Sequence, residues 1–469
     1  MRESLFRAAQ RGEAYLLEET VGQFQDEELT GRVHADSFLP LPAAPVPPAV
    51  ADPLVVWPYP AGTADLIDRA NCADHFVRVN PAYRVLTPEG SLLCDGDGRV
   101  PPGGPTVVFA SFEWLLPRLA VDPLDGYLVL AGRRIDAVLN EMTLGHLARR
   151  GSLPAPRPVN GRRLIDPPRT HVLNGTQIAL DKGAQLDLFA ALADVLRPFG
   201  VAPLTYLSAP ERELAVQAAV DIAGRGRGAV LRPFAASQGT GIAFVDGAGP
   251  FEARRAAARR AVAELEAAVT RKYGVDGAYP ITITPFVEST KIGGAVTDLR
   301  LFVVHDPHTG GLHALPGVVR RAQRRLAGGT ALDRAMACTN LNGNPVADPL
   351  PGPRMFPLAD ERVLDQVGLS ADRLTDLGRA ATTMWAAAVR REQAERGRSL
   401  PFCYGSVDVL VREGAGAVLI EMNGANVGMH PSVHPRFLDA FARASTGALA
   451  SLGLGAAPPL APLETACAR

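Results

Sequence analysis

The sequence predicts an α/β fold, built from α+β lobes in which strands and helices alternate. Short runs rich in Val, Leu, Ile and Phe, bounded by glycine and proline, recur from Leu54 to Ile420 and are typical of strands. Between them, residues 252–272 and 371–396 carry apolar side chains at the three- and four-residue spacing of an amphipathic helix. Two proline-rich stretches interrupt this pattern, and we expect them to separate the chain into distinct units.

The length and composition are those of a globular protein with several units. A chain of 469 residues exceeds one ordinary hydrophobic core and suggests roughly two to four subdomains. Apolar residues make up 47% of the chain and charged residues 21%. The formal net charge is -1, from 48 basic and 49 acidic side chains, so bulk charge predicts neither a nucleic acid nor a membrane surface as a partner.

The sequence favours the cytoplasm. No apolar run approaches the roughly 18–20 residues of a membrane-spanning helix. The first residues, MRESLFRAAQRGEAYLLEE, are charged throughout and lack the apolar core of a signal peptide. The cysteines are odd in number and have no CxxC spacing, which fits reduced thiols better than a disulfide framework. They are Cys72, Cys94, Cys338, Cys403 and Cys467.

The expected organisation follows the proline-rich stretches. Residues 1–36 look helical and polar, and Leu39 to Pro53 read as a semi-rigid connector. Short apolar runs then predict an N-terminal α/β domain, which ends at the second proline-rich stretch, Leu153 to Arg169. The expected units are 1–53, the helical segment with its connector; 54–170, the α/β domain; 171–445, the main domain, divided at 290; and 446–469, a C-terminal tail.

The main domain is expected to alternate helices and strands. Residues 181–198, 252–272, 371–396 and 435–453 are the predicted helices. Predicted strands lie within 228–246, at 279–288, 298–305 and 311–320, and in a pair within 405–434, while 344–360 is expected to be a proline-broken loop.

The strand pair carries three oxygen-bearing side chains. Asp408 lies on its first strand, and Glu421 and Asn423 end the second, directly after the apolar run AVLI. Antiparallel pairing would place Asp408 opposite this end, and residues two apart project from one face. Such ligands suit magnesium, which prefers hard oxygen donors and usually keeps phosphates and water as further ligands. An ordinary acidic strand end at the surface remains the alternative.

A small-residue loop offers a second candidate site. Its sequence, FAASQGTGI from Phe234 to Ile242, provides backbone N–H groups and hydroxyls that could fold over a triphosphate. Lys182 and Arg232 could neutralise the phosphate oxygens. A plain hairpin loop and surface cations remain the alternatives. The candidate loop residues are Ser237, Gln238, Gly239, Thr240 and Gly241.

Two arginines stand at strand ends. Arg300 follows Asp298 in DLRLFVV, and Arg320 ends ALPGVVR. A guanidinium matches a carboxylate or an acyl phosphate through two hydrogen bonds, so both arginines are candidates for holding a substrate. A surface pair between Asp298 and Arg300, worth little energy, remains the alternative.

The order of these motifs resembles the ATP-grasp superfamily, whose carboxylate–amine ligases include D-alanine ligase and glutathione synthetase. The resemblance covers about residues 171–445, and the thirteen-residue gap before the E-x-N pair is its most specific part. It implies an ATP-grasp fold preceded by an N-terminal α/β domain. It also implies ATP and Mg²⁺ as cofactors, with Mn²⁺ as a substitute.

The resemblance also implies roles for individual residues. The implied metal ligands are Asp408, Glu421 and Asn423; the implied nucleotide-binding residues are Lys182, Arg232, the loop and a hinge at 284–288 that includes Phe286, Val287 and Glu288; and Arg300 and Arg320 are the implied catalytic residues. Arg232 departs from the family, which usually has a lysine there. Ser406 stands where D-alanine ligases carry an arginine, so we expect Arg300 or Arg320 to stabilise the transition state.

Four further residues are substrate candidates. Asn340 and Asn342 precede the metal strands, and Asn426 and His430 follow them. The spacing of His430 and His434 hints at zinc, but Pro431 would break the helix that aligns them. A loop that contacts substrate and a plain structural loop are both open.

The sequence therefore predicts an ATP-dependent carboxylate–amine ligase that forms an amide or peptide bond through an acyl phosphate. The expected partners are a small carboxylate and a small amine, such as an amino acid or short peptide. A homodimer is the commonest closed assembly, but the sequence does not fix the oligomeric state. A phosphotransferase with the same metal site, or a non-catalytic nucleotide-binding protein, remains an alternative.

Overall fold

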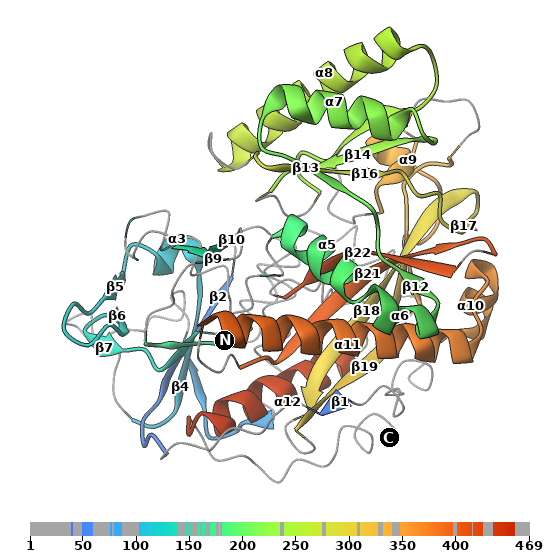
Figure 1. Ribbon diagram of the computed structural model, residues 1–469. Helices are drawn as coiled ribbons and strands as arrows, with labels where there is room; N and C mark the ends of the chain where they lie inside the picture. The colour runs from blue at the N-terminus through green and yellow to red at the C-terminus, as the bar shows by residue number, and fades with distance from the viewer. Residues whose placement is uncertain are drawn as a thin grey trace.

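The computed structural model confirms a mixed α/β fold (Figure 1). It describes residues 39–40, 49–59, 76, 79–86, 103–138, 147, 151, 153, 157–159, 162–164, 169–174, 178, 181–234, 239–273, 278–306, 310–326, 332–339, 348–396, 401–414, 416–424 and 435–454. The helix predicted over residues 1–36 lies outside these residues.

A parallel sheet forms the N-terminal part of the described chain. Its strand order is β11 (His171–Val172), β8 (Ala137–Val138), β2 (Leu54–Tyr59), β4 (Thr106–Ser111) and β3 (Arg84–Leu86). The apolar runs at residues 54–57 and 106–110 form its two central strands, and their side chains are buried because a parallel sheet is covered on both faces. Smaller elements lie beside it: α3 (Phe112–Leu115), β5 (Leu119–Val121), β6 (Leu128–Leu130), β7 (Arg133–Arg134), and the hairpin β9 (Arg157–Val159) with β10 (Arg162–Leu164).

A larger mixed sheet occupies the centre of the molecule. Its main order is β1 (Leu39–Pro40), β19 (Gly311–Arg321), β18 (Ala295–Asp306), β21 (Tyr404–Arg412), β22 (Gly416–Asn423) and β12 (Val201–Ala202). Two short strands extend it: β17 (Lys291–Ile292) pairs with β18, and β20 (Met355–Pro357) pairs with β19. The long strands β18, β19, β21 and β22 are antiparallel neighbours.

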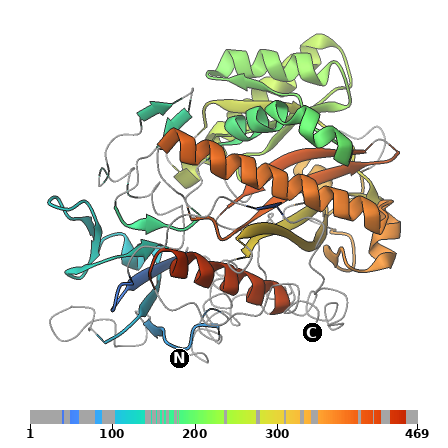
Figure 2. The ribbon, with the colours of Figure 1, turned by 60° about the horizontal axis from the view of Figure 1, so that its bottom comes forward.

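Helices cover both faces of the central sheet. One apolar core joins it to α5 (Lys182–Ala191), α10 (Glu361–Val367) and α11 (Ala371–Arg396). On the opposite face, α12 (Pro435–Ser451) lies over β18 and β21, where Phe441 contacts both Phe302 and Tyr404 edge-on. Figure 2 shows α11 and α12 on opposite sides of the sheet. The apolar core on this face also includes Trp57 of β2, so it joins the N-terminal sheet to the central one.

A four-stranded antiparallel sheet forms a separate lobe at the top of Figure 1. Its order is β13 (Leu207–Ala209), β16 (Ile281–Pro285), β14 (Gly228–Arg232) and β15 (Ala243–Asp246). The helices α7 (Arg212–Ala223) and α8 (Phe251–Tyr273) pack on it through an apolar core of its own. We call this unit the small lobe.

Several boundaries differ from those expected. The helix predicted over 181–198 breaks at Leu192 into α5, α6 (Ala193–Leu196) and a 3₁₀ turn at Arg197–Phe199. The strand predicted over 279–288 ends at Pro285, and the loop predicted over 344–360 contains β20 because its backbone pairs with β19. α12 ends at Ser451, two residues before the end of the helix predicted over 435–453.

Candidate active site

Strand register brings the predicted site residues to one region of the central sheet. Asp408 lies opposite Arg300 on one neighbouring strand and opposite Glu421 on the other. Residues directly opposite each other in antiparallel strands project from the same face. Asp298 lies opposite Arg320, and Asn423 opposite Ser406. With Lys182 and Arg232, these side chains make up what we call the polar cluster: Lys182, Arg232, Asp298, Arg300, Arg320, Asp408, Glu421 and Asn423.

A β-bulge shapes the metal-binding strand that the sequence predicts. The register of β21 with β22 shifts between Asp408 and Val409, so that Ile420 has no opposite partner. A bulge bends its strand and leaves a backbone group unpaired by the ladder. The Ile420 carbonyl accepts a hydrogen bond from Arg232 Nη1 at 3.1 Å. The bulge therefore joins the small lobe to the strand that carries Glu421.

Asp408 is bonded by three other members of the polar cluster. Its side chain is 5% exposed and accepts from Arg300 Nε and Nη2, each at 2.8 Å. Arg320 Nη2 lies 2.9 Å from Asp408 Oδ2, and Asn423 Nδ2 lies 3.3 Å from the same oxygen. Burial by itself would raise the pKa of Asp408, but the two guanidiniums outweigh it and hold the pKa well below its usual range. The carboxylate is therefore ionised.

Asp298 continues this charged network. It accepts from Arg320 Nε at 2.8 Å and Nη2 at 2.5 Å, and from Thr339 Oγ1 at 2.6 Å. Although burial opposes it, the pKa of Arg320 is raised by its two aspartate neighbours. The surface pair between Asp298 and Arg300, which the sequence left open, does not form. Each aspartate bonds an arginine on the adjacent strand instead, because the register places them opposite each other.

Lys182 reaches the same region from a helix. Asp181 caps the start of α5 by accepting from the Ala184 backbone N–H at 2.9 Å, and Lys182 is the first residue of the helix. Its Nζ forms an ion pair with Glu421 Oε1. The Glu421 side chain is 26% exposed, against 11% for Lys182 and 5% for Asp408. Of the Asp408 and Glu421 carboxylates, that of Glu421 is therefore more exposed to a ligand.

Arg232 is buried at the end of β14, and the bulge carbonyl is one of its partners. Burial lowers the pKa of its guanidinium, and the nearby Glu421 opposes that shift. Arg232 Nη2 lies 3.5 Å from Thr284 Oγ1, at the start of the predicted hinge. Within that hinge, the Phe286 N–H donates to the Gly228 carbonyl at 2.8 Å, and Glu288 pairs with Lys291. Residues 284–288 therefore lead directly from the small lobe to the central sheet.

Part of the predicted glycine loop is described. Gly239 and Gly241 have φ values of 68° and 70°, a backbone region that favours glycine. A Cβ on Gly241 would come within 2.9 Å of Val269 Cγ2, so this turn packs closely under α8. Thr240, between these glycines, is described and half-buried, whereas the remaining loop, substrate and histidine candidates lie outside the described residues: Ser237, Gln238, Asn340, Asn342, Asn426, His430 and His434.

The structure adds residues that sequence reasoning gave no role. Thr339 bonds Asp298, and Gln185 bonds the backbone of the predicted metal strand. Asn174, at a φ of 57°, accepts from the Cys403 and Tyr404 N–H groups and donates to the Gly424 carbonyl at 3.3 Å. Gln185 interrupts the apolar face of a predicted helix, and this could have been noticed in the sequence. The contacts of Thr339 and Asn174 required the fold.

The polar cluster fits a magnesium ion by the chemistry of its donors. Two carboxylates and an amide oxygen on adjacent strand positions are hard oxygen ligands. Within the described ranges, no three His, Cys, Asp or Glu side chains gather in one place. No helix in the described part of the chain is long and apolar enough to cross a membrane.

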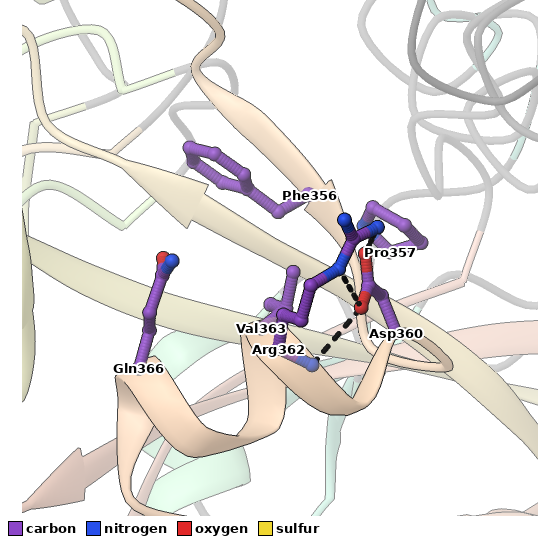
Figure 3. A pocket seen from close by; sticks show the side chains of 6 residues that line it. All are labelled: Phe356, Pro357, Asp360, Arg362, Val363 and Gln366. Carbon is purple, nitrogen blue, oxygen red and sulfur yellow. Dashed lines mark hydrogen bonds and ion pairs between the residues drawn. The ribbon is translucent and has the colours of Figure 1, made fainter.

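A pocket of about 350 Å³ lies elsewhere, beside β20 and α10 (Figure 3). Asp360 and Arg362 form an ion pair in its wall at 2.8 Å. The lining residues are Phe356, Pro357, Asp360, Arg362, Val363 and Gln366, none of which belongs to the polar cluster.

Comparison with known proteins found similarity only among solved structures. A D-cycloserine synthetase is 17% identical, with a TM-score of 0.43, over 84% of this chain and 98% of that one. A D-alanyl-alanine synthetase A from Vibrio cholerae is 10% identical, with a TM-score of 0.43, over 81% and 91%. A structure described as an ATP-grasp ligase with a minimal precursor is 12% identical, with a TM-score of 0.36, over 80% and 91%. No protein-family model and no curated protein matches the chain.

These identities and TM-scores describe a remote likeness of fold and add no argument about activity. We therefore infer the function of this chain from the residues of its polar cluster.

Proposed function

We propose that this protein is an ATP-dependent carboxylate–amine ligase that forms an amide or peptide bond through an acyl phosphate. One observation carries the proposal. Cationic side chains that can bind phosphate lie beside oxygen-bearing side chains that can bind magnesium, where the small lobe meets the central sheet. Lys182 contacts Glu421, and Arg232 reaches the backbone of the same strand from the small lobe. A triphosphate with a divalent cation requires both kinds of group in one place.

The residues of the polar cluster, apart from Asp298, have three roles in this proposal. Lys182 and Arg232 would neutralise phosphate oxygens. Asp408, Glu421 and Asn423 would hold Mg²⁺, which when bound offsets the negative charge that develops at the β- and γ-phosphates. Arg300 and Arg320 would stabilise the acyl phosphate, because guanidiniums match phosphate oxygens through paired hydrogen bonds.

The proposed reaction has two balanced steps. A substrate carboxylate oxygen attacks the γ-phosphorus of ATP, and ADP leaves with the bonding electron pair. An amine nitrogen then attacks the acyl carbon, phosphate departs, and the nitrogen loses a proton as the amide forms. No covalent enzyme nucleophile is required. Cys403 supports this, since burial raises the pKa of its thiol far above neutrality.

One observation favours an ATP-dependent phosphotransferase as a second candidate. Arg300 pairs with Asp408, and Arg320 pairs with both Asp298 and Asp408. Guanidiniums held by aspartates have less capacity to hold a substrate carboxylate, and a kinase acting on a hydroxyl has no such need. The two candidates differ in their products.

Product analysis tests the proposal. The purified protein is incubated with Mg-ATP and pooled amino acids, short peptides and small carboxylates. We expect ADP release that depends on substrate, and a product whose mass equals acid plus amine minus water. A phosphorylated product would assign the phosphotransferase instead. Nucleotide binding without any turnover, together with full biological activity of Glu421→Ala, would favour a non-catalytic role.

A further inference from the structure

A buried glutamine lies against the end of the predicted metal strand. Gln185, on α5, is 1% exposed. Its Oε1 accepts from the Met422 N–H at 2.8 Å, and its Nε2 donates to the Met422 carbonyl at 3.1 Å. One side-chain amide thus bonds both backbone groups of one residue, as a neighbouring strand would.

The location of this contact gives it a consequence for the metal ligands. Met422 is the residue between Glu421 and Asn423, and strand alternation sends its own side chain into the core on the opposite face. β12 pairs with β22 only at Ala417 and Val418. Beyond that point no described strand borders the outer edge of β22, and the Gln185 amide takes this place. It therefore holds the backbone from which both ligands project.

The strand needs such support because the bulge at Ile420 interrupts its pairing with β21 immediately before Glu421. A bulge alters the local bend and twist of a strand, so the directions of the following side chains depend on what holds the backbone. Gln185 also lies one turn after Lys182 on the same helix. The Gln185 contact therefore links the helix that begins with Lys182 to the strand that carries Glu421 and Asn423.

We propose that Gln185 is a positioning residue for the divalent cation, acting through the backbone of Met422. The inference rests on the proposed function, because it needs a cation held by Glu421 and Asn423. Groups that orient metal ligands typically contribute about 10–100-fold in metal affinity. Mg²⁺ demands near-octahedral geometry, whereas Ca²⁺ accepts flexible coordination, so misplaced ligands should affect Mg²⁺ more.

Cation binding to Gln185→Met tests the inference. This change keeps the length of the side chain and removes both hydrogen bonds. Mn²⁺ binding in the presence of ADP is followed by electron paramagnetic resonance, and Mg²⁺ and Ca²⁺ are compared as competitors. We expect Mn²⁺ affinity to fall about 10–100-fold. We also expect the preference for Mg²⁺ over Ca²⁺ to shift toward Ca²⁺, which general destabilisation would not produce.

Two further variants make the result decisive. Gln185→Asn keeps an amide that is one methylene too short to reach both backbone groups, and we expect an intermediate shift. Leu188→Val, on the same helix, loosens the apolar core but keeps both hydrogen bonds from Gln185 to Met422, and it should leave the cation preference unchanged. Unchanged affinity and preference in both Gln185 variants would overturn the positioning role. Absence of Mn²⁺ binding by the unaltered protein with ADP would instead overturn the proposed function.

Discussion

The ion pair between Lys182 and Glu421 joins two residues that the sequence assigned to different ligands. The lysine was expected to hold phosphate and the glutamate a metal. Their attraction satisfies both charges, and leaving either charge unpaired in a partly buried site would be costly. A nucleotide with its cation offers each partner a replacement of the correct sign, whereas either one alone leaves one charge without a partner. Cation and nucleotide should therefore favour each other's binding.

Replacement of Lys182 tests this coupling. Lys182→Met removes the ammonium group and so leaves Glu421 without this ion-pair partner. We expect ADP affinity to fall about 10–100-fold, as for loss of a charge-assisted hydrogen bond of about 1.5–3 kcal/mol. Mn²⁺ affinity without nucleotide should rise, because Glu421 no longer has a competing cation. Calorimetric titrations of Mn²⁺ and ADP, each alone and together, measure both effects. A fall in Mn²⁺ affinity without nucleotide would contradict the coupling.

At the scale of elements, the antiparallel β18–β21–β22 unit is held by close packing against α11. Trp385 of α11 is fully buried and donates from Nε1 to the Ser406 carbonyl at 3.3 Å. Its ring lies directly against Gly405, where any side chain would collide with it. Gly405 and Ser406 lie just before Asp408 on the same strand, so this contact holds the strand against the helix close to Asp408.

Gly405→Ala is expected to destabilise the fold. The added Cβ would lie 2.3 Å from Trp385 Cζ2, and a buried indole ring has no open space to move into. Overpacking of this kind costs about 1–3 kcal/mol and occasionally more. Urea unfolding followed by circular dichroism measures the change. Gly226→Ala is the matched control, since nothing lies within 4 Å of its Cβ position. Equal stabilities for the two variants would contradict the packing argument.

At the scale of the whole molecule, buried interfaces connect the N-terminal sheet, the central sheet and α12. Tyr83 lies just before β3 of the N-terminal sheet, and its hydroxyl donates to the Leu454 carbonyl just after α12. Asn80 bonds Thr446, a residue of α12. On the central sheet, the end of β18 carries His305, whose backbone N–H donates to the Cys403 carbonyl at 2.8 Å. The imidazole of His305 is half-buried, so a titratable group lies partly away from water.

This imidazole predicts a loss of stability in mild acid. Burial lowers the pKa of His305, although Asp306 opposes the shift and His313 adds to it. The folded state then binds fewer protons than the unfolded state below the unfolded pKa of about 6.5. Stability from this group is present above that pH and is lost as pH falls toward the folded pKa. Urea unfolding between pH 7.5 and 5.5 should show this decline, and His305→Gln should reduce its slope. An unchanged slope would show that His305 does not contribute.

Sequence reasoning located most strands and helices of the main domain because their apolar periodicity is strong over long segments. It missed the break at Leu192 and the short strand β20, since both depend on what the backbone meets in the folded chain. It also named Asp408, Glu421 and Asn423 from their spacing, and the cationic members of the polar cluster from other motifs and from the family resemblance. The partners of these residues could not be predicted, because Arg300 and Arg320 are more than eighty residues away along the chain.

The sequence by itself determined the α/β character of the fold, the strand pair with its Asp and E-x-N residues, and the resemblance in motif order. These features are local, since they depend on periodicity and spacing within short segments. Only the tertiary structure decided that Asp408 lies between two guanidiniums, that Lys182 meets Glu421, and that Gln185 takes the place of a strand beside Met422. Such contacts depend on sheet register and helix docking, which the packing of the whole chain sets.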